Sequence, residues 1–391
     1  MNVLKLIGRT EALFDHDIDQ YEAELKKKIA NSSFLVLGGA GSIGQAVVKE
    51  IFKRNPKLIH VVDLSENNLT ELVRDLRSSR GYISGDFKTF AIDIGSNIFD
   101  IFISNAAEYD FVLNFSAIKH VRSEKDPYTL LRMIETNIFN TDKTITQSVK
   151  NRCKKYFCVS TDKAANPVNL MGGTKRIMEK ALINRSTEIQ ISTARFANVA
   201  FSDGSLLHSF NQRMLKRQPI VAPKDVKRYF LTPEESGQLC ILAAISGENR
   251  DVFFPKLSER LHLISFSQIA NSYLREQNYT PYLCENEDEA RSKANELIQQ
   301  NKWPCLFSES DTTGEKDFEE FFTKDETLDM NRFRGIGIIK TKSNRFQSID
   351  IERLKNKYNE WLKGEKLSKK EIVRELIHHL PELEYNDLGK Y

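Results

Sequence analysis

The sequence predicts an α/β fold, a Rossmann-type doubly wound parallel sheet with a smaller C-terminal α/β region. Between residues 33 and 196, short apolar runs alternate with helical patterns, as in sheets whose strands are buried on both faces. The first run leads directly into a glycine cluster that opens a helical pattern. Right-handed crossovers then place helices on both faces of one sheet.

Each expected element has its own apolar run or helical period. The expected strands are 33–38, 58–63, 87–93, 110–117, 155–160 and 189–196. Between them, helical patterns end at Phe52 and cover 68–77, 127–149 and 170–183. Beyond residue 200 the pattern weakens, and we expect helices at 205–215 and 233–245 and strands at 253–257 and 279–284.

These patterns divide the chain into four parts. An amphipathic helix over 11–30 indicates an N-terminal helical extension, residues 1–30, ahead of the Rossmann domain, residues 31–200. Residues 201–340 form the smaller region over the edge of the sheet, where a substrate would bind. Residues 341–391 are charged and mostly helical, and this tail is either an interaction segment or a surface helix.

The composition excludes several classes of protein. Apolar residues make up 40% of the 391 residues and charged residues 28%, which suits a sizeable core and is unlike a disordered chain. Lys plus Arg number 57 and Asp plus Glu 54, so the charge balance gives no footprint for nucleic acid. No apolar stretch reaches the roughly 18–20 residues that span a bilayer, and residues 1–17 lack the apolar core of a secretory signal, so we expect neither a membrane nor a secreted protein. Five scattered cysteines without a CxxC pair predict no disulfide framework, no metal site and a reducing cytoplasm.

The glycine cluster has the spacing of a dinucleotide-binding loop. Gly38, Gly41 and Gly44 follow the first strand and open a helix. Glycines there permit a tight turn and close approach of a pyrophosphate, which the helix N-terminus attracts. Asp63 ends the second strand, where its carboxylate would accept from ribose hydroxyls and repel the 2′-phosphate of NADP. The expected cofactor is therefore NAD, and NADP is less favoured.

Further polar residues follow the third and fourth strands. Asp93 would either meet the adenine edge or cap the helix after it, and the sequence leaves both roles open. Residues 115–120 end the fourth strand, at the edge where open α/β sheets bind ligands. Lys119 and His120 are either ligand contacts at this edge or ordinary surface residues.

The end of the fifth strand combines several reactive groups. Ser160, Thr161, Asp162 and Lys163 end this strand, and the segment Met171-Gly172-Gly173-Thr174-Lys175 then opens a helix. A hydroxyl, a carboxyl and an amine therefore lie at the carboxyl edge of the sheet, beside the place of a nicotinamide. Met171 and Lys175 are four residues apart and share one face of the helix.

With this helix the chain resembles the short-chain dehydrogenase/reductase family, in its extended branch that modifies nucleotide sugars. That family has a Tyr-x-x-x-Lys pair here, in which the lysine holds the nicotinamide ribose and the tyrosine is the acid/base. In this chain the tyrosine position is Met171, whose thioether cannot exchange a proton. One interpretation is a non-catalytic NAD-binding regulator.

A narrower resemblance favours an enzyme. The segment STDKAANPVNLMGGTKR looks like the sugar-nucleotide 4,6-dehydratases of bacterial polysaccharide and glycan biosynthesis, several of which have methionine at this position. LNFSAIKHVRSEKDP, RFANVAFSDGS and KRYFLTPEES resemble segments of that family in the same order. GRTEALF and SDTTGEKDFEEFF look like a soluble subgroup of that family that acts on UDP-N-acetylglucosamine, so the resemblance covers about residues 5–341. Leu37 and Phe115 depart from it, because relatives often have smaller residues there.

The resemblance implies contacts for the substrate and the cofactor. Arg228 should pair with the diphosphate of the sugar nucleotide, since a guanidinium is a bidentate donor; the alternative is a surface residue before a helix. The implied substrate contacts are Lys119, His120, Asn198, Asp203, Gly204, Ser205, His208 and Arg228. The implied cofactor contacts are Gly38, Ala40, Gly41, Ser42, Ile43, Gly44, Asp63, Ser65, Asp93, Ile94, Phe115, Ser116, Ala117, Lys119, Ser160, Lys175 and Val199.

The implied reaction converts UDP-N-acetylglucosamine to UDP-2-acetamido-2,6-dideoxy-hexos-4-ulose. Hydride leaves C4 for NAD, water is lost across C5 and C6, and the hydride returns to C6. Lys163 would be the base and Asp162 the acid, Thr161 would bind the C4 oxygen, and Lys175 would orient the nicotinamide. A UDP-sugar C4 or C5 epimerase and a non-catalytic NAD-binding protein remain alternatives. The family also dimerises through the helices at 127–149 and 170–183, which implies a homodimer or larger homo-oligomer.

Overall fold

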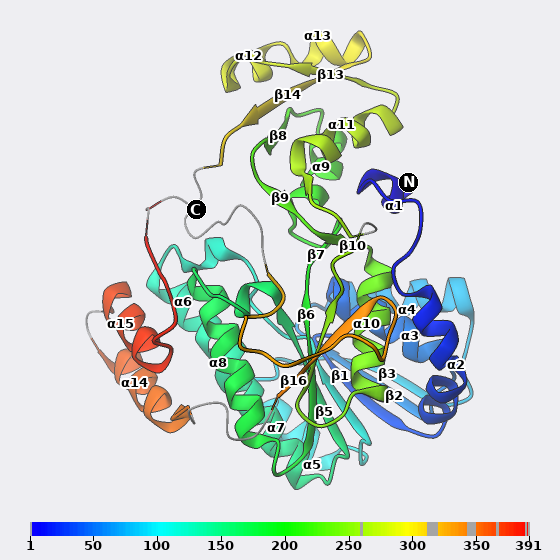
Figure 1. The fold of residues 1–391 in the computed structure, drawn as a ribbon, viewed down its shortest axis with the longest axis vertical. Coiled ribbons are helices and arrows are strands. Elements are labelled where there is room, and N and C mark those ends of the chain that lie inside the picture. Colours follow the sequence, from blue (N-terminus) through cyan, green and yellow to red (C-terminus); the bar gives the residue numbers. More distant parts are fainter. Residues whose placement is uncertain are drawn as a thin grey trace.

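A nine-stranded sheet forms the centre of the fold (Figure 1). Its order is β15-β16-β11-β6-β5-β4-β1-β2-β3, and the strands from β3 to β11 are parallel to their neighbours. β16 and β15 extend one edge in antiparallel pairing. The strands are β1 (Ser33–Leu37), β2 (Leu58–Asp63), β3 (Asp86–Ala91), β4 (Phe111–Asn114), β5 (Lys155–Thr161), β6 (Gln190–Phe196), β11 (Asp251–Pro255), β15 (Leu328–Asp329) and β16 (Ile336–Lys340). The predicted doubly wound parallel sheet is confirmed.

Helices cover both faces of this sheet, each over its own apolar cluster (Figure 1). One face carries α2 (Asp15–Ala30), α3 (Ser42–Phe52), α4 (Glu66–Arg80) and α10 (Pro233–Ser246). The other carries α5 (Asn97–Asn105), α7 (Asn140–Lys150) and α8 (Leu170–Arg185). Local sequence sets the helix starts: Thr232 and Glu235 form a capping box around Pro233 at the start of α10.

The computed structural model describes residues 2–258, 261–310, 320–341, 349–364, 367–387 and 389. Its smaller lobe lies beyond the carboxyl ends of the central strands (Figure 1). In this lobe α1 (Val3–Leu6), α9 (Leu206–Leu215), α11 (Phe266–Glu276), α12 (Glu287–Ser292) and α13 (Ala294–Gln299) accompany a parallel sheet of β13 (Thr280–Leu283), β14 (Lys302–Ser308) and β8 (Ile220–Pro223). The short pairs β7 (Asn198–Val199) with β10 (Phe230–Leu231), and β9 (Lys227–Arg228) with β12 (Ile264–Ser265), join this lobe to the body.

Some elements differ from the prediction. The sequence places the strand expected at 253–257 in the smaller C-terminal region. In the structure this strand is β11, which pairs with β6 in the central sheet. The chain therefore returns to the large sheet after part of the small lobe, which an apolar run cannot reveal because strand partners are chosen by tertiary packing. The fourth strand ends at Asn114, so residues 115–120 are a loop, and the N-terminal helix begins at Asp15. The functional division of the chain into domains remains a prediction.

The helix expected at 127–149 is interrupted. α6 (Pro127–Ile134) leads into a π-helical segment, Glu135–Phe139, before α7 begins at Asn140. The apolar and polar residues of this segment keep a helical period, so the extra residue in the turn leaves no signal in the pattern. π-turns often occur at functional sites.

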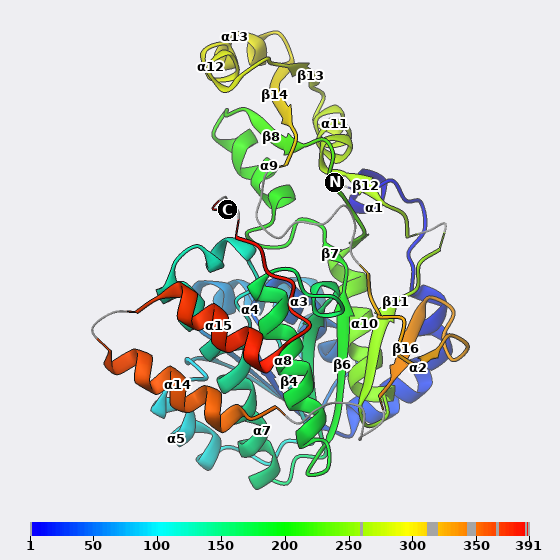
Figure 2. The ribbon, with the colours of Figure 1, turned by 60° about the vertical axis from the view of Figure 1, so that its left-hand side comes forward.

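The C-terminal tail contributes α14 (Ile351–Lys363) and α15 (Lys369–His379), which lie beside α8 in both views (Figures 1 and 2). They cover an apolar face made by α6, the π-segment and α8. The buried residues of this cluster are Leu130, Leu131, Met133, Ile134, Ile138, Leu170, Met171 and Ile177 on the body and Ile349, Leu354, Ile372, Leu376, Leu380 and Leu383 in the tail. The helices expected to form a dimer interface thus pack against this chain's own tail, and the dimer itself stays a prediction.

Two features of the described residues bear on the excluded classes of protein. Among them, no helix combines the length and the apolar character needed to cross a membrane. All five cysteines are buried and unpaired.

Candidate active site

The expected site residues gather at the carboxyl edge of the central sheet. β1 pairs with β2 on one side and with β4 on the other. The strand order reverses between β1 and β4, and open α/β sheets bind ligands above such a reversal. The loops after β1, β4 and β5 therefore meet where a dinucleotide and its substrate would lie.

The glycine loop is shaped by close backbone contacts. Gly38 has a φ of 66°, and a Cβ there would lie 2.6 Å from the backbone nitrogen of Ser116. A Cβ at Gly44 would lie 2.3 Å from the carbonyl oxygen of Gly38. At Gly41, in contrast, the nearest atom to a Cβ would be the Gly38 oxygen, 3.5 Å away. Gly38 and Gly44 are thus required by internal packing, whereas Gly41 leaves open space in which a ligand could lie.

The start of α3 suits the phosphates of a dinucleotide. Gly41 is the N-cap of this helix, and no side chain caps its first turn by a hydrogen bond. The amides of this turn and the positive end of the helix dipole are therefore available to an anion. Ala40 is buried and Ile43 packs against the core, so these residues present mainly backbone. The residues present fit a dinucleotide cofactor.

Asp63 is fixed beside this loop by backbone donors. Its Oδ2 accepts a hydrogen bond from the Ala40 nitrogen at 2.9 Å, and its Oδ1 accepts one from the Ser65 nitrogen at 2.9 Å. The Ser65 hydroxyl caps α4 by accepting from the Asn68 nitrogen at 3.3 Å. The carboxylate is thereby held at the end of β2, where the sequence predicts a contact with the adenosine ribose of the cofactor.

Asp93 does not cap the helix that follows it. The N-cap of α5 is Ser96, whose hydroxyl accepts from the Phe99 nitrogen at 3.3 Å. The Asp93 carboxylate accepts from the Gly95 nitrogen at 2.8 Å and pairs with Arg132 at 3.1 Å. The capping alternative is therefore wrong, since Ser96 lies three residues closer to the helix, and the adenine role stays a prediction. Ile94 is buried in the core.

The loop after β4 is held by two residues that the sequence reasoning missed. Asn114 Oδ1 accepts from the Ser116 nitrogen at 2.9 Å, which fixes the turn through Phe115 and Ala117. Asn137, in the π-segment, accepts from the Ile118 nitrogen at 3.0 Å and donates to Thr174 Oγ1 on α8 at 3.0 Å. Both asparagines are buried. The available signal in the sequence was an amide residue among apolar residues, because a buried amide needs hydrogen-bond partners.

Thr161, Asp162 and Lys163 form one hydrogen-bonded group at the end of β5. Asp162 Oδ1 accepts from the Thr161 hydroxyl at 2.8 Å and from the Lys163 nitrogen at 2.9 Å. The Lys163 ammonium lies 3.2 Å from the same oxygen. The structure therefore brings the expected acid, base and hydroxyl into direct contact, in a geometry that allows a proton to pass between Asp162 and Lys163.

Lys175 lies behind this group on α8. Its Nζ donates to the carbonyl of Val159 at 3.2 Å, and burial lowers the pKa of this amine despite the charge of Glu179. Ser160 donates to Glu179 at 2.6 Å, so the hydroxyl expected to bind cofactor is engaged within the protein. Burial opposes ionisation of Glu179, but Arg195 and Arg176 outweigh it and lower the pKa to about 2. Glu179 is thus a fixed anion beneath the site.

Met171 lies in an apolar environment at the start of α8. Its side chain belongs to the cluster shared with the tail, and its nitrogen donates to Glu124 Oε1 at 2.6 Å. Burial raises the pKa of Glu124 to about 7, while hydrogen bonds from the Met171 and Leu170 nitrogens oppose the shift. Glu124 is a further residue that the sequence reasoning missed. It shares the charged segment KHVRSEKDP with Asp126, and nothing in that segment shows which acid becomes buried.

Residues expected to contact substrate approach the glycine loop from the loop after β4 and from the segment before α9. The Asp203 nitrogen donates to Ser42 Oγ at 2.8 Å, and a Cβ at Gly204 would lie 2.8 Å from His120 Nε2. Lys119 and His120 have solvent-accessible side chains. Even so, partial desolvation by the surrounding protein lowers the pKa of both side chains. The charge of Asp203 opposes this shift at Lys119, and the charge of Lys119 adds to it at His120. These groups are therefore brought together above α3.

The remaining expected contacts lie on the short strands that join the two lobes and at the start of α9. The Asn198 nitrogen donates to the Tyr229 carbonyl at 3.1 Å, and Val199 pairs with Leu231. Ser205 caps α9 by accepting from the His208 nitrogen at 3.1 Å. Arg228 is 4% exposed and its Nη1 donates to the Lys227 carbonyl at 2.8 Å, so the alternative of a surface arginine is wrong.

Comparison with known proteins identifies similar chains. The pattern of a family described as "Polysaccharide biosynthesis protein" matches residues 34–341. Capsular polysaccharide biosynthesis protein CapD of Staphylococcus aureus is 26% identical over 68% of this chain, which spans 45% of that relative. A UDP-N-acetylglucosamine 4,6-dehydratase (inverting) of Campylobacter jejuni is 26% identical over 58% of this chain and 67% of its own length. The solved structure of Pen from Bacillus thuringiensis superposes with a TM-score of 0.64 at 23% identity, covering 85% of this chain and 98% of that chain. UDP-sugar epimerases are also among the similar proteins.

Proposed function

Because this chain belongs to the family of polysaccharide biosynthesis proteins, we propose that it is an NAD-dependent 4,6-dehydratase of UDP-N-acetylglucosamine. The observation that supports this most is the contact of Thr161, Asp162 and Lys163 at the end of β5. An elimination needs a base and an acid near one another, and this group contains both beside the lysine of α8. The similarity to a dehydratase of the same substrate class agrees with it.

The glycine loop, Asp63 and Lys175 would hold the cofactor. Gly41 leaves space at the start of α3 for the pyrophosphate, and Asp63 is placed for the adenosine ribose. Lys175 would bind the nicotinamide ribose, since its amine is held at the end of β5. The chemistry that NAD supplies when bound is hydride removal from sugar C4 and hydride return at C6, so no external reductant is needed.

The residues of the chain would perform the proton transfers. Lys163 would remove the C5 proton, which a 4-ketone acidifies, and Asp162 would protonate the departing C6 hydroxyl. Thr161 would hydrogen-bond the C4 hydroxyl by accepting from it, because its own hydroxyl donates to Asp162, and would act in place of the tyrosine that Met171 replaces. The proton that leaves the C4 hydroxyl would pass through Thr161 to Asp162, which would give it to the departing C6 hydroxyl. Lys163, acting as the free amine beside Asp162, would keep the C5 proton and return it to C5 when C6 receives its hydrogen.

The small lobe would bind the sugar nucleotide. Arg228 is buried at the junction of the lobes, where a guanidinium could pair with the diphosphate. Lys119, His120 and the segment 203–208 would surround the sugar together with Asn198. The contacts of Asp203 with Ser42 and of Gly204 with His120 support this. A cytoplasmic location and a homo-oligomer remain part of the proposal.

An epimerase of the same family is the second candidate, because UDP-sugar epimerases are among the similar proteins. An epimerase keeps the 6-hydroxyl, so its product has the mass of the substrate, whereas a dehydratase product is lighter by one water. A non-catalytic NAD-binding protein would leave the substrate unchanged. The test is mass spectrometry of UDP-N-acetylglucosamine incubated with the purified protein without added cofactor. An unchanged mass in the presence of demonstrably bound NAD would contradict the dehydratase. NMR of the same sample then distinguishes an epimerised sugar from unchanged substrate, and unchanged substrate would contradict both enzyme proposals.

A further inference from the structure

The end of the C-terminal tail crosses the start of α8. Beyond α15, residues 380–385, which we call the strap, run along the first turns of this helix (Figure 2). Leu380 and Leu383 of the strap are buried in the same apolar cluster as Leu170 and Met171. The strap therefore contacts the helix that carries Lys175, at the turn that contains Met171.

The two glycines after Met171 have different neighbours. A Cβ at Gly172 would lie 2.5 Å from the carbonyl oxygen of Lys163, so this glycine lets α8 approach the proposed base. A Cβ at Gly173 would lie 3.2 Å from Leu383 and 3.7 Å from Leu380, so this glycine lets the strap approach α8. The first turn of α8 is thus packed between the proposed catalytic loop and the strap.

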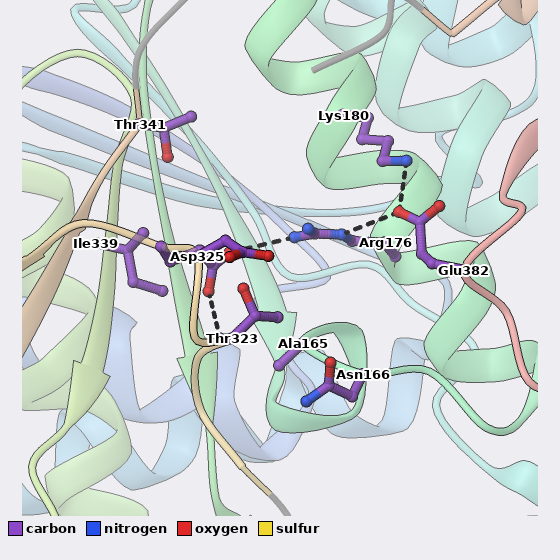
Figure 3. A pocket seen from close by; sticks show the side chains of 10 residues that line it. Ala165, Asn166, Arg176, Lys180, Thr323, Asp325, Ile339, Thr341 and Glu382 are labelled. Carbon is purple, nitrogen blue, oxygen red and sulfur yellow. Dashed lines mark hydrogen bonds and ion pairs between the residues drawn. The ribbon is translucent and has the colours of Figure 1, made fainter. Parts of the chain in front are cut away.

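Polar contacts extend the strap to the neighbouring segments. The Glu384 nitrogen donates to the Pro167 carbonyl at 3.1 Å, in the loop that joins Lys163 to α8. Glu382 pairs with Lys180 at 2.6 Å and lies 3.8 Å from Arg176, and Figure 3 shows its carboxylate directed at both side chains. The strap therefore touches the loop, the first turn and the basic face of one helix.

The loop after Lys163 faces a cavity on its other side, where Asn166 donates to Glu320 at 2.7 Å. Ala165 and Asn166 border a cavity of about 440 Å³, which Arg176, Lys180 and Glu382 also line (Figure 3). Empty space provides no packing that would hold the loop. The strap is therefore one of the contacts that fix the loop against α8.

We propose that residues 380–385 are a positioning strap for the active site, which holds Lys163 and Lys175 at the end of β5 by clamping the 164–169 loop and the first turns of α8. The proposal rests on the proposed function for the roles of these lysines. Without the strap the loop and the helix would remain folded but less fixed. Displacement of catalytic groups by about 1 Å can cost about 100-fold in rate.

The test compares two tail variants in the full chain. Leu383→Ala removes the strap contact at Gly173, whereas Leu354→Ala removes a fully buried leucine from α14. For Leu383→Ala we expect amide exchange of residues 163–175 to be at least about tenfold faster, and kcat to fall about 10- to 100-fold with KM changed little. Leu354→Ala should leave both quantities close to the parent.

A third variant keeps the helix well folded. Gly173→Ala favours helix formation, but its Cβ would press on Leu383 at 3.2 Å, so it should raise exchange in 163–175 without lowering the melting temperature. The strap proposal is overturned if amide exchange in 163–175 is unchanged in both Leu383→Ala and Gly173→Ala. It is also overturned if Leu354→Ala changes exchange and kcat as much as Leu383→Ala does. Faster exchange in Leu383→Ala with no fall in kcat would equally overturn it. If the parent shows no dehydration, the proposed function fails, and the exchange measurement still decides whether the strap fixes this segment.

Discussion

The Lys163 ammonium lies 3.2 Å from Asp162 Oδ1, so adjacent residues at the end of β5 form an ion pair within the proposed active site. Asp162 is buried and Lys163 is partly accessible, which places the amine nearer to an incoming substrate. The Thr161 hydroxyl donates to the same oxygen at 2.8 Å. This arrangement allows the two proton-transfer roles to be separated by substitution.

Lys163→Ala should abolish exchange of the C5 proton and turnover, because the proposed base is lost. Oxidation at C4 should still occur and be visible as the absorbance of enzyme-bound reduced nicotinamide. Loss of a general base typically costs about 10²- to 10⁴-fold in rate. Deuterium incorporation followed by mass spectrometry checks this, with Lys154→Ala, an exposed lysine just ahead of the same strand, as the control.

Asp162→Asn should block the loss of water while still permitting some exchange at C5, because the amide cannot protonate the C6 hydroxyl. The substitution keeps an oxygen that can accept from Thr161 and Lys163, so the loop should stay folded. Exchange and product formation are measured on the same sample. If both this variant and Lys163→Ala turned over within a few-fold of the parent, the chemistry would belong to other residues.

The cofactor preference should depend on Asp63. Apo-protein should bind NAD more tightly than NADP, since the 2′-phosphate would meet a carboxylate that Ala40 and Ser65 hold in place. Two like charges about 4 Å apart repel by several kcal/mol at an effective dielectric of 20, so Asp63→Asn should reduce the preference by roughly tenfold or more. Titration calorimetry measures both affinities, and Asp75→Asn on the outer side of α4 is the control. Equal or tighter NADP binding by the parent would refute the assignment.

Much of the fold and the position of the site could be predicted from the sequence. Buried parallel strands are apolar until they emerge at the carboxyl edge, so Asp63 and Thr161 marked the ends of β2 and β5. The glycine spacing likewise located the turn into α3, because Gly38 and Gly44 are required by backbone contacts within that short segment. These features are local, and a single sequence shows them.

Features that depend on distant partners could not be predicted. The sequence allows Asp93 either to contact adenine or to be a helix N-cap. Ser96 is the N-cap of α5, because it directly precedes this helix. Met171 was recognised as unable to exchange a proton, but its burial against Leu380 and Leu383 joins segments far apart in the chain. An apolar stripe shows that a helix face is covered, and it does not show which segment covers it.

The buried acid Glu124 should make stability depend on pH. Burial raises its pKa from 4.5 to about 7, so folding favours the protonated form. Its contribution is complete below about pH 4.5 and is lost as the pH rises to about 7, a change on the order of 3 kcal/mol. Lys369 and Asp387 of the tail, together with the Leu170 and Met171 amides, are the groups that act on it.

Glu124→Gln should remove this dependence, because the amide is neutral at every pH and keeps an oxygen for the Met171 nitrogen. Urea unfolding at about pH 5.5 and 7.5 measures the free energy of unfolding. The variant should gain stability relative to the parent at the higher pH, and the exposed Glu371→Gln should not. The same difference between parent and variant at both pH values would show that Glu124 is ionised throughout.

The last prediction concerns the apolar face of α6 and α8, which the tail helices cover. Leu376 of α15 is fully buried on this face, whereas its neighbour Ile377 is 37% exposed. A carboxylate at position 376 would be buried without a partner, which is costly enough to detach α15. Leu376→Glu should therefore expose an apolar surface and associate with further copies, so its mass by light scattering should rise with concentration. Ile377→Glu places the same charge on the same helix at an accessible position and should keep the parent's mass. A Leu376→Glu protein that keeps this mass at every concentration would show that α15 stays in place or that the uncovered face does not self-associate.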